Sequence, residues 1–396
     1  MIKLYGANWC PDCRRSKAFL TEQGIPFEYI DLEKIPEATA IVEELNDGKR
    51  IIPTIIFDDG EILVEPSNEE LADKLELSRQ AMEHTYDVIV VGGGPTGLTT
   101  AIYTARESLR TLVIEASGLG GQAGVTEKFE NYPGFPEGIS GREFATRIVA
   151  QAERFGVELL PAVGVTSVRS EGTSLVVETS TGVHLHAGAV VIATGSTYRR
   201  TGAAGESDLI GSGVHFCATC DGPFYRGAAE LLVLGGGNSG LEEGLFLTQF
   251  ADHVTVLERG SSLIGSKILQ ERVLEHPRMD VQLDTQVTEF LGDDSGKLTG
   301  VRLTTSDGAT RVHSANGAFV FIGLKPNTGW LDGSLDADPG GFLVTSEGLM
   351  TSMPGVFAAG DVRQGSTKQL ASAVGEGAAA AIQVRRYLDA KVSPGT

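Results

Sequence analysis

The chain lacks the features of a membrane-embedded, secreted or nucleic-acid-binding protein. No stretch reaches about 18 consecutive apolar residues, so we predict no segment that spans a membrane. Residues 1–6 enter a strand-like pattern without the apolar segment of a signal peptide, which favours a cytoplasmic location. A formal net charge of −20 disfavours nucleic acid and anionic membranes as partners.

Cysteine is scarce, and its spacing is informative. The chain has four cysteines, which form two Cys-x-x-Cys pairs, Cys10/Cys13 and Cys217/Cys220. A secreted disulfide scaffold would place more cysteines in a shorter chain. Zinc-binding pairs usually lie about 15–20 residues apart, whereas roughly 200 residues separate these two. We therefore predict two redox dithiols and no metal site.

Proline is not enriched, at 15 residues, whereas glycine is abundant, at 51 of 396 residues. The glycine content of about 13% exceeds the typical value of about 7%. Without a Gly-X-Y repeat, this composition excludes collagen and favours close approach of the backbone to ligands.

Residues 1–78 form the first predicted domain. Their pattern predicts, in order, strand 2–5, helix 11–22, strand 27–31, helix 36–45, a hairpin of strands 54–57 and 62–64, and helix 68–74. Cys10 then lies where the first strand meets the first helix. A helix N-terminus favours the thiolate, so Cys10 is the predicted nucleophile and Cys13 the resolving thiol.

This domain resembles the glutaredoxins, in particular their mycoredoxin-like branch. The resemblance is carried by Trp9-Cys10-Pro11-Asp12-Cys13, Ile52-Pro53-Thr54 and Pro66-Ser67-Asn68. It implies a cis Pro53, with Ile52 and Pro53 binding substrate beside the dithiol. Asp12 replaces the usual aromatic residue, and its carboxylate is expected to raise the pKa of Cys10. The loop that holds the glutathione carboxylate in ordinary glutaredoxins is absent, which argues against glutathione as substrate.

Residues 79–85 are polar and non-periodic, and we predict a linker. As a flexible chain, seven residues would span only about 15 Å. The first domain would therefore be tethered close to the next.

Two dinucleotide-binding patterns follow. In the first, strand 86–91 enters Gly92-Gly93-Gly94-Pro95-Thr96-Gly97, a helix runs to residue 105, and strand 110–114 ends at Glu115. In the second, strand 231–234 enters Gly235-Gly236-Gly237-Asn238-Ser239-Gly240, and helix 241–248 and strand 254–257 lead to Glu258. Such glycines let a pyrophosphate reach the helix N-terminus, and the acid accepts from a ribose hydroxyl.

With Cys217-Ala218-Thr219-Cys220-Asp221-Gly222, Gly120-Gly121-Gln122, Glu130-Asn131-Tyr132-Pro133-Gly134 and Asp361, residues 86–396 resemble the low-molecular-weight thioredoxin reductases. The implied fold class is α/β, with a thioredoxin-fold domain before two nested Rossmann-like domains. The resemblance implies an FAD domain at 86–200 and 325–396, an NAD(P) domain at 201–324, and a homodimer.

The resemblance also implies the roles of individual residues. Cys220 would lie beside the flavin, Cys217 would be the interchange thiol, and Asp221 would protonate the leaving thiolate. The implied FAD-binding residues are Gly92, Gly94, Gly97, Glu115, Gly121, Gln122, Asn131, Asp361 and Gln369. Those for the nicotinamide cofactor are Gly235, Gly237, Asn238, Ser239, Gly240, Glu258 and Arg259.

The second pattern departs from the family where the electron donor is chosen. NADPH-specific thioredoxin reductases carry His-Arg-Arg-x-x-x-Arg here, whereas this chain has Glu258-Arg259-Gly260-Ser261-Ser262-Leu263-Ile264. A glutamate about 4 Å from a 2′-phosphate charge is repelled by roughly 4 kcal/mol at an effective dielectric constant of 20. The flavoprotein subunit of alkyl hydroperoxide reductase, a relative that uses NADH, has a similar glutamate. We predict NADH over NADPH, although Arg259 leaves NADPH as the alternative.

The leading hypothesis is an enzyme that passes electrons from NAD(P)H through FAD and Cys217/Cys220 to Cys10/Cys13, and on to a thioredoxin-fold protein or a peroxiredoxin. The alternatives are a flavin-dependent dithiol oxidase and a ferredoxin-fed reductase whose first domain only docks a partner. Gly195-Ser196 and Gly323-Leu324 are candidate hinges, and His215 is expected to be a packing residue.

Overall fold

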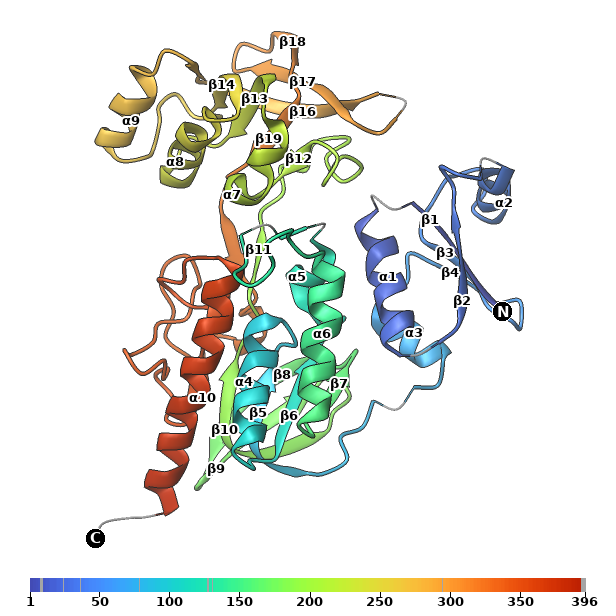
Figure 1. Cartoon of the computed structure of the whole chain (residues 1–396), viewed down its shortest axis with the longest axis vertical. Coiled ribbons are helices and arrows are strands. Elements are labelled where there is room, and N and C mark those ends of the chain that lie inside the picture. Colours follow the sequence, from blue (N-terminus) through green and yellow to red (C-terminus); the bar gives the residue numbers. More distant parts are fainter. Residues whose placement is uncertain are drawn as a thin grey trace. The chain divides into compact units, whose positions relative to one another are not determined.

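The computed structural model of this chain describes residues 1–392 apart from 8, 9, 24, 36, 78, 127, 130 and 294. Its contacts divide the chain into two units (Figure 1). One contains residues 12–197 and the segment that begins at 325, together with the first strand, and the other contains residues 198–324. Among the helices of the described residues, none is both long and apolar enough to cross a lipid bilayer.

The N-terminal module has a four-stranded mixed sheet, in the order β2-β1-β3-β4. Its elements are β1 (Ile2–Gly6), α1 (Pro11–Glu22), β2 (Phe27–Asp31), α2 (Glu37–Leu45), β3 (Thr54–Ile56), β4 (Ile62–Val64) and α3 (Asn68–Lys74). The predicted order of strands and helices is confirmed. The Ile52–Pro53 bond is cis, as expected, and Pro36, the predicted start of α2, lies outside the described residues.

The linker residues between this module and the next strand are held by hydrogen bonds. Arg79 forms ion pairs with Glu69 and Asp73 of α3. The Met82 amide donates to Glu158 Oε1 at 2.7 Å. These contacts hold the segment to α3 at one end and to Glu158 at the other.

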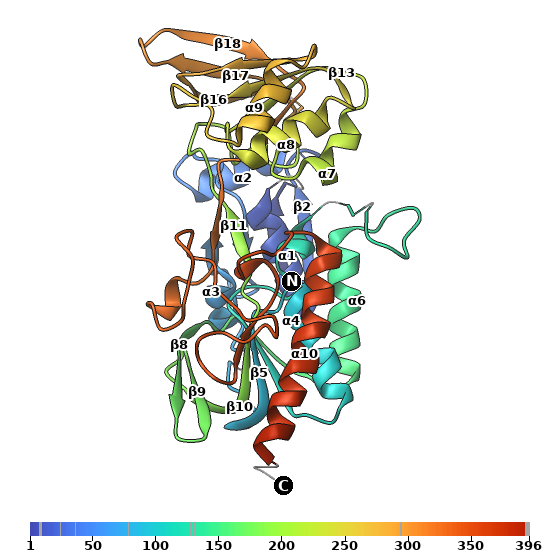
Figure 2. The same ribbon diagram turned by 90° about the vertical axis from the view of Figure 1, so that its left-hand side faces the viewer.

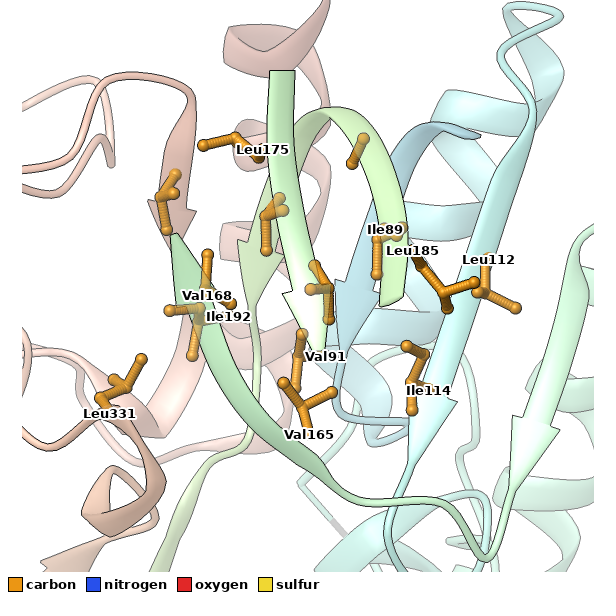
Figure 3. Packing of buried hydrophobic residues seen from close by; sticks show 14 of the residues in the cluster. Ile89, Val91, Leu112, Ile114, Val165, Val168, Leu175, Leu185, Ile192 and Leu331 are labelled. Atoms are coloured by element: carbon orange, nitrogen blue, oxygen red, sulfur yellow. The ribbon is translucent and has the colours of Figure 1, made fainter. Parts of the chain in front are cut away.

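The second sheet is mostly parallel, in the order β7-β6-β5-β10-β9-β8, with β21 also paired to β10. Its elements are β5 (Thr85–Val91), α4 (Pro95–Arg106), β6 (Thr111–Glu115), α5 (Gly121–Val125), α6 (Gly141–Arg154), β7 (Glu158–Pro161), β8 (Val165–Glu171), β9 (Ser174–Thr179) and β10 (His184–Ile192). Val88 and Val90 of β5 pack toward the helices. The alternate residues Ile89 and Val91 pack against the β8–β9 hairpin (Figure 3).

The C-terminal segment completes this sheet from far along the chain. It contains η2 (Gly329–Leu331), β21 (Val356–Ala358), η3 (Gly360–Val362) and α10 (Leu370–Val392). Val356 of β21 pairs in parallel with Val190 of β10. Helix α10 lies beside α4 and α6 on one face of the sheet (Figures 1 and 2).

The second unit repeats this design around a five-stranded parallel sheet, in the order β12-β19-β13-β14-β15. Its elements are β12 (Val214–His215), α7 (Ala218–Asp221), η1 (Gly222–Tyr225), β13 (Ala228–Leu234), α8 (Asn238–Leu247), β14 (Ala251–Leu257), α9 (Lys267–Leu274), β15 (Met279–Gln282), β16 (Thr285–Gly292), β17 (Leu298–Thr305), β18 (Thr310–Ser314) and β19 (Gly317–Val320). Leu231 and Val233 face helices α8 and α9, whereas Leu232 and Leu234 face the antiparallel sheet β16-β17-β18.

Helix α8 begins earlier than predicted. The sequence predicted a helix over 241–248, after a glycine turn that ran to Gly240. In the structure Gly237 is the N-cap, so Asn238, Ser239 and Gly240 form the first helical turn. The glycine turn is therefore shorter, and the helix N-terminus lies closer to the strand.

The chain enters and leaves the second unit through a two-stranded ribbon of β11 (Ser196–Tyr198) and β20 (Leu324–Pro326). The Asn327 side chain joins the two crossings, since its Nδ2 donates to Thr194 O at 2.8 Å and its Oδ1 accepts from Thr197 Oγ1 at 2.7 Å. The hinge candidates Gly195 and Gly323 both have positive φ, at 68° and 109°.

Close packing of α10 on α4 predicts opposite effects for two glycines. A Cβ at Gly377 would lie 2.4 Å from Thr96 O, whereas one at Gly375 would meet no atom within 4 Å. We expect Gly377→Ala to lower the free energy of unfolding by roughly 1–3 kcal/mol through overpacking. Gly375→Ala should raise it by about 0.5–1 kcal/mol through helix propensity. Urea unfolding of both full-length variants, followed by circular dichroism, makes this comparison, and equal effects would contradict it.

Candidate functional site

The first glycine turn joins β5 to α4 in a conformation that excludes side chains. Gly92 has a φ of 112°, and a Cβ there would lie 2.4 Å from Ala193 O. A Cβ at Gly97 would lie 1.9 Å from Gly92 O, so the first helical turn can pack on the strand only with glycine at this position. A Cβ at Gly94, the N-cap of α4, would meet no protein atom within 4 Å. The space in front of this helix N-terminus is therefore open.

Glu115, at the end of β6, closes this turn. Its Oε2 accepts from Gly93 N at 2.7 Å, and its Oε1 accepts from Ser117 N at 2.7 Å. The Ser117 hydroxyl also donates to Oε1, at 2.9 Å. A carboxylate has about four acceptor positions, so one stays available for a ribose hydroxyl. The structure thus places Glu115 where the sequence pattern requires an acid.

The other predicted FAD residues come from distant segments. A Cβ at Gly121 would lie 3.1 Å from Gly94 Cα, so this loop covers the first turn. Asn131 Nδ2 donates to Gln369 Oε1 at 3.3 Å, although 238 residues separate them. Gln122 is exposed, and Glu130 lies outside the described residues.

Asp361 belongs to a buried polar cluster at the turn before α10. A Cβ at Gly360 would lie 2.4 Å from Thr96 Oγ1, so this turn lies against the first residues of α4. The Gly360 amide donates to Glu376 Oε2 at 2.7 Å. Burial raises the pKa of Asp361, and the nearby Lys368 and Ser366 oppose that shift.

The second turn, between β13 and α8, repeats the first. A Cβ at Gly240 would lie 1.9 Å from Gly235 O. Glu258 Oε2 accepts from Gly236 N at 2.7 Å, and Oε1 accepts from Gly260 N at 2.7 Å. Asn238 Oδ1 accepts from Ser266 N at 2.7 Å, which fixes the loop after β14. Ser239 and Arg259 are exposed.

Both turns fit a dinucleotide. Each combines a glycine N-cap without a capping side chain, a helix of at least ten residues, and a carboxylate bonded to the turn. The amides of the first helical turn have no partner within their helix, so they can donate to a pyrophosphate. A Cβ at Gly237 would approach only Ile264, at 3.9 Å, which leaves the approach to the second helix open as well.

The N-terminal dithiol lies at the start of α1. Cys10 and Cys13 are disulfide-bonded and almost fully buried, with 4% and 1% of their surfaces exposed. The guanidinium of Arg15 forms an ion pair with Asp12 and donates to Pro66 O at 2.7 Å. Arg15 therefore compensates part of the Asp12 charge beside the dithiol. The i, i+3 spacing of the pair could have revealed this partner. Trp9 lies outside the described residues.

The second dithiol lies between β12 and η1, on the short helix α7. Cys217 is disulfide-bonded, and the side chain of Cys220 is outside the described part of the chain. The Asp221 amide donates to Cys217 O at 3.1 Å, so Asp221 follows Cys217 by one turn. Among the described residues, no group of three or more His, Cys, Asp or Glu could hold a metal ion.

Sequence reasoning missed Glu243, which lies on α8 beside the second dithiol. Its carboxyl accepts a hydrogen bond from the Ala218 amide of α7, and its Oε2 is buried without a hydrogen-bond partner. Burial raises the pKa of Glu243, and the charge of Glu242 adds to the shift. No sequence motif marks this residue, because its contact with α7 depends on how the two helices pack.

Comparisons with known proteins agree with this geometry. Residues 86–377 match the pyridine nucleotide-disulphide oxidoreductase family, and residues 2–62 match the glutaredoxin family. Over 308 residues the chain is 40% identical to a thioredoxin reductase of Listeria monocytogenes, a match that covers 78% of this chain and 95% of the relative. A thioredoxin reductase of Streptomyces clavuligerus is 42% identical over 312 residues, or 78% of this chain and 96% of the relative.

Solved structures show the same similarity. The thioredoxin reductase of Streptococcus pyogenes superimposes with a TM-score of 0.72 at 39% identity, covering 78% of this chain and 99% of that one. The thioredoxin reductase of Giardia duodenalis gives a TM-score of 0.73 at 32% identity, covering 78% of this chain and 100% of that one.

The raised pKa of Glu243 predicts a pH-dependent stability. The folded chain binds more protons than the unfolded chain between pH 4.5, the ordinary value, and the raised value, so stability falls as pH rises through that window. Glu243→Gln removes this loss. Its stability relative to the natural chain should increase with pH, by at most about 1.4 kcal/mol per unit, less the part screened by water.

Urea unfolding between pH 5 and pH 8 measures this difference. Glu271→Gln, at an exposed position on α9, is the matched control and should give a difference that does not change with pH. If the difference in free energy of unfolding between Glu243→Gln and the natural chain also stayed constant with pH, the prediction would be contradicted.

Proposed function

This chain belongs to the pyridine nucleotide-disulphide oxidoreductase family, as a thioredoxin reductase-like disulfide oxidoreductase with a glutaredoxin domain, and on that premise we propose that it passes electrons from NADH through its own two dithiols to a protein disulfide. Members of this family depend on FAD and NAD(P)H. The observation that carries the proposal is that Cys10, Cys13 and Cys217 are all disulfide-bonded in one chain with two dinucleotide folds.

The chain's own residues have distinct tasks in this proposal. The first glycine turn, with Glu115 and Asp361, holds FAD, and the second, with Glu258, holds the nicotinamide cofactor. When bound, the flavin supplies hydride acceptance and two-electron transfer to a disulfide. Asp221, one turn after Cys217, supplies a proton when that disulfide opens. The buried Cys10/Cys13 pair receives the electrons and reduces the partner.

Transfer toward the N-terminal dithiol is favoured by typical potentials. Thioredoxin has a potential of about −270 mV and glutaredoxins about −200 to −230 mV, so such a step releases roughly 2–3 kcal/mol. A short tether also raises the effective concentration of the two dithiols into the millimolar range, provided that they can dock. Delivery within one chain and delivery across a homodimer both satisfy this requirement.

The proposed donor rests on Glu258. Its two oxygens are fixed by Gly236 N and Gly260 N, so the carboxylate stays at the end of β14. There it can accept from both ribose hydroxyls of NADH, and a charged hydrogen bond contributes about 1.5–3 kcal/mol. The 2′-phosphate of NADPH would approach the same charge, with the exposed Arg259 as its cationic neighbour.

The partner in this proposal is a thioredoxin-fold protein or a peroxiredoxin disulfide. The proposal places the enzyme in the cytoplasm, where dithiols are kept reduced, and assembles it as a homodimer. The intact second glycine turn favours a nicotinamide donor over the ferredoxin-fed and dithiol-oxidase alternatives.

Replacement of Glu258 should change the choice of donor. We expect Glu258→Gln to lower kcat/KM for NADH about tenfold, because the neutral amide accepts more weakly, and to raise it for NADPH. Arg259→Gln is the matched control and should lower only the value for NADPH. Steady-state rates with both cofactors measure these changes. A higher kcat/KM for NADPH than for NADH in the natural enzyme would refute NADH as the donor.

The relay itself is tested by counting electrons. In an anaerobic NADH titration followed by the flavin spectrum, the natural chain should take up three electron pairs and Cys10→Ser two. Cys217→Ser should take up one, because electrons can then reach neither dithiol. Two pairs in Cys217→Ser would show that the N-terminal dithiol bypasses Cys217. A flavin that stays oxidised with both NADH and NADPH would refute the proposal that the chain is a nicotinamide-dependent disulfide reductase.

A further inference from the structure

We propose that His215 positions the Asp221 carboxyl by donating to it, so that a His215–Asp221 pair serves the Cys217/Cys220 dithiol. This inference rests on the proposed function, in which Asp221 is the acid of that dithiol. It assigns a role to a histidine that the sequence suggested was only a packing residue.

The fold brings His215 beside Asp221 from a different element. His215 ends β12, two residues before Cys217, and its register with β19 places it opposite Phe319. Only 8% of its surface is exposed. Its Nδ1 lies 3.5 Å from Asp221 Oδ2.

Tyr225, from η1, occupies the other ring nitrogen. Its hydroxyl lies 2.6 Å from His215 Nε2, and the two rings meet edge to face. Burial raises the pKa of Tyr225, with the Asp221 charge adding to the shift, so the phenol stays protonated and can donate. If Nε2 accepts from the phenol, the proton of a neutral imidazole lies on Nδ1, which faces Asp221.

An aromatic ring and a few titratable groups surround this pair. The ring of Phe319 packs on both His215 and Tyr225, which excludes water from that side. Among the described residues, the titratable groups near the pair are Tyr225, which contacts His215, and Glu243 of α8, which accepts from the Ala218 amide of the helix that carries Asp221.

The proposed step balances as a thiol–disulfide exchange. The Cys217 thiol loses its proton to Asp221, whose carboxylate is held by the Nδ1 proton of His215, and the thiolate attacks one sulfur of an acceptor disulfide. That S–S bond breaks, a mixed disulfide forms, and one thiolate leaves. The Cys220 thiol then gives its proton to water and attacks Cys217 as the thiolate, which restores the internal disulfide and releases the second thiolate. The dithiol loses two electrons and two protons, and the acceptor gains two electrons.

The test measures this exchange directly, without the nicotinamide cofactor. The full-length, FAD-loaded chain carries Cys10→Ser and Cys13→Ser throughout, so that only Cys217 and Cys220 react. After reduction with dithiothreitol and its removal, the single-turnover rate with 5,5′-dithiobis(2-nitrobenzoate) is measured from pH 5.5 to pH 9. The variants are His215→Asn, Tyr225→Phe, Asp221→Asn and the double variant His215→Asn/Asp221→Asn.

We expect His215→Asn to lower the rate about tenfold at pH 7 and to remove the inflection that the pair gives to the pH profile. The double variant should be no slower than Asp221→Asn, because the two groups act as a unit. Tyr225→Phe removes the hydroxyl that bonds to His215 Nε2 and fixes the tautomer of the imidazole, so it should shift the inflection. This variant tests the proposal even if His215→Asn does not fold. His253→Asn, which alters another histidine–carboxylate pair in the same unit, should leave the profile unchanged.

Two outcomes would overturn the inference. One is a pH–rate profile of His215→Asn that keeps the inflection of the natural chain. The other is a double variant whose loss of rate equals the product of the losses in the two single variants. Failure of the proposed function is distinguishable, because Asp221→Asn would then react at the natural rate at every pH.

Discussion

Both dinucleotide folds of this chain depend on a contact between two glycines that is too close to leave room for a side chain. In each, a glycine in the first helical turn lies where a Cβ would come 1.9 Å from the carbonyl oxygen of the glycine that ends the strand. The contact sets how closely α4 packs on β5 and α8 on β13. It thereby fixes the direction of each helix N-terminus. A carboxylate at the end of the following strand then bonds to the turn, through Glu115 in one unit and Glu258 in the other. The two glycine turns are thus two versions of one geometric solution.

The two dithiols differ in the charges around them. Arg15 compensates Asp12 next to Cys10, whereas carboxyl groups from Asp221 and Glu243 surround the helix that follows Cys217. A cation stabilises a thiolate and a carboxylate destabilises it. A stabilised thiolate favours the reduced form of its dithiol and raises the reduction potential. This difference in local charge is consistent with the direction of transfer in the proposed relay, from the Cys217 pair toward the Cys10 pair.

The sequence predicted those parts of the fold and site that depend on short spacings. The glycine turns, the acids that follow them and the two Cys-x-x-Cys pairs are local patterns whose physical reasons can be read along the chain. The start of α8 was misplaced because weak helix formers can still occupy a first turn when the strand and the glycine contact fix it. The Asn131–Gln369 bond, the Glu243–Ala218 bond and the His215–Asp221–Tyr225 contacts depend on tertiary packing. Local patterns do not encode such contacts, so only the structure revealed them.

The ribbon of β11 and β20 has a consequence for synthesis of the chain on the ribosome. Because residues 198 and 324 lie on paired strands, the unit between them can fold as soon as it emerges. The larger sheet cannot be completed then, since β21 and α10 are the last elements to be made. Until they arrive, β10 exposes an unpaired edge and α4 lacks the helix that covers it. A nascent chain would therefore hold a finished nucleotide domain inside an unfinished one, and the last seventy or so residues would decide when the larger domain closes.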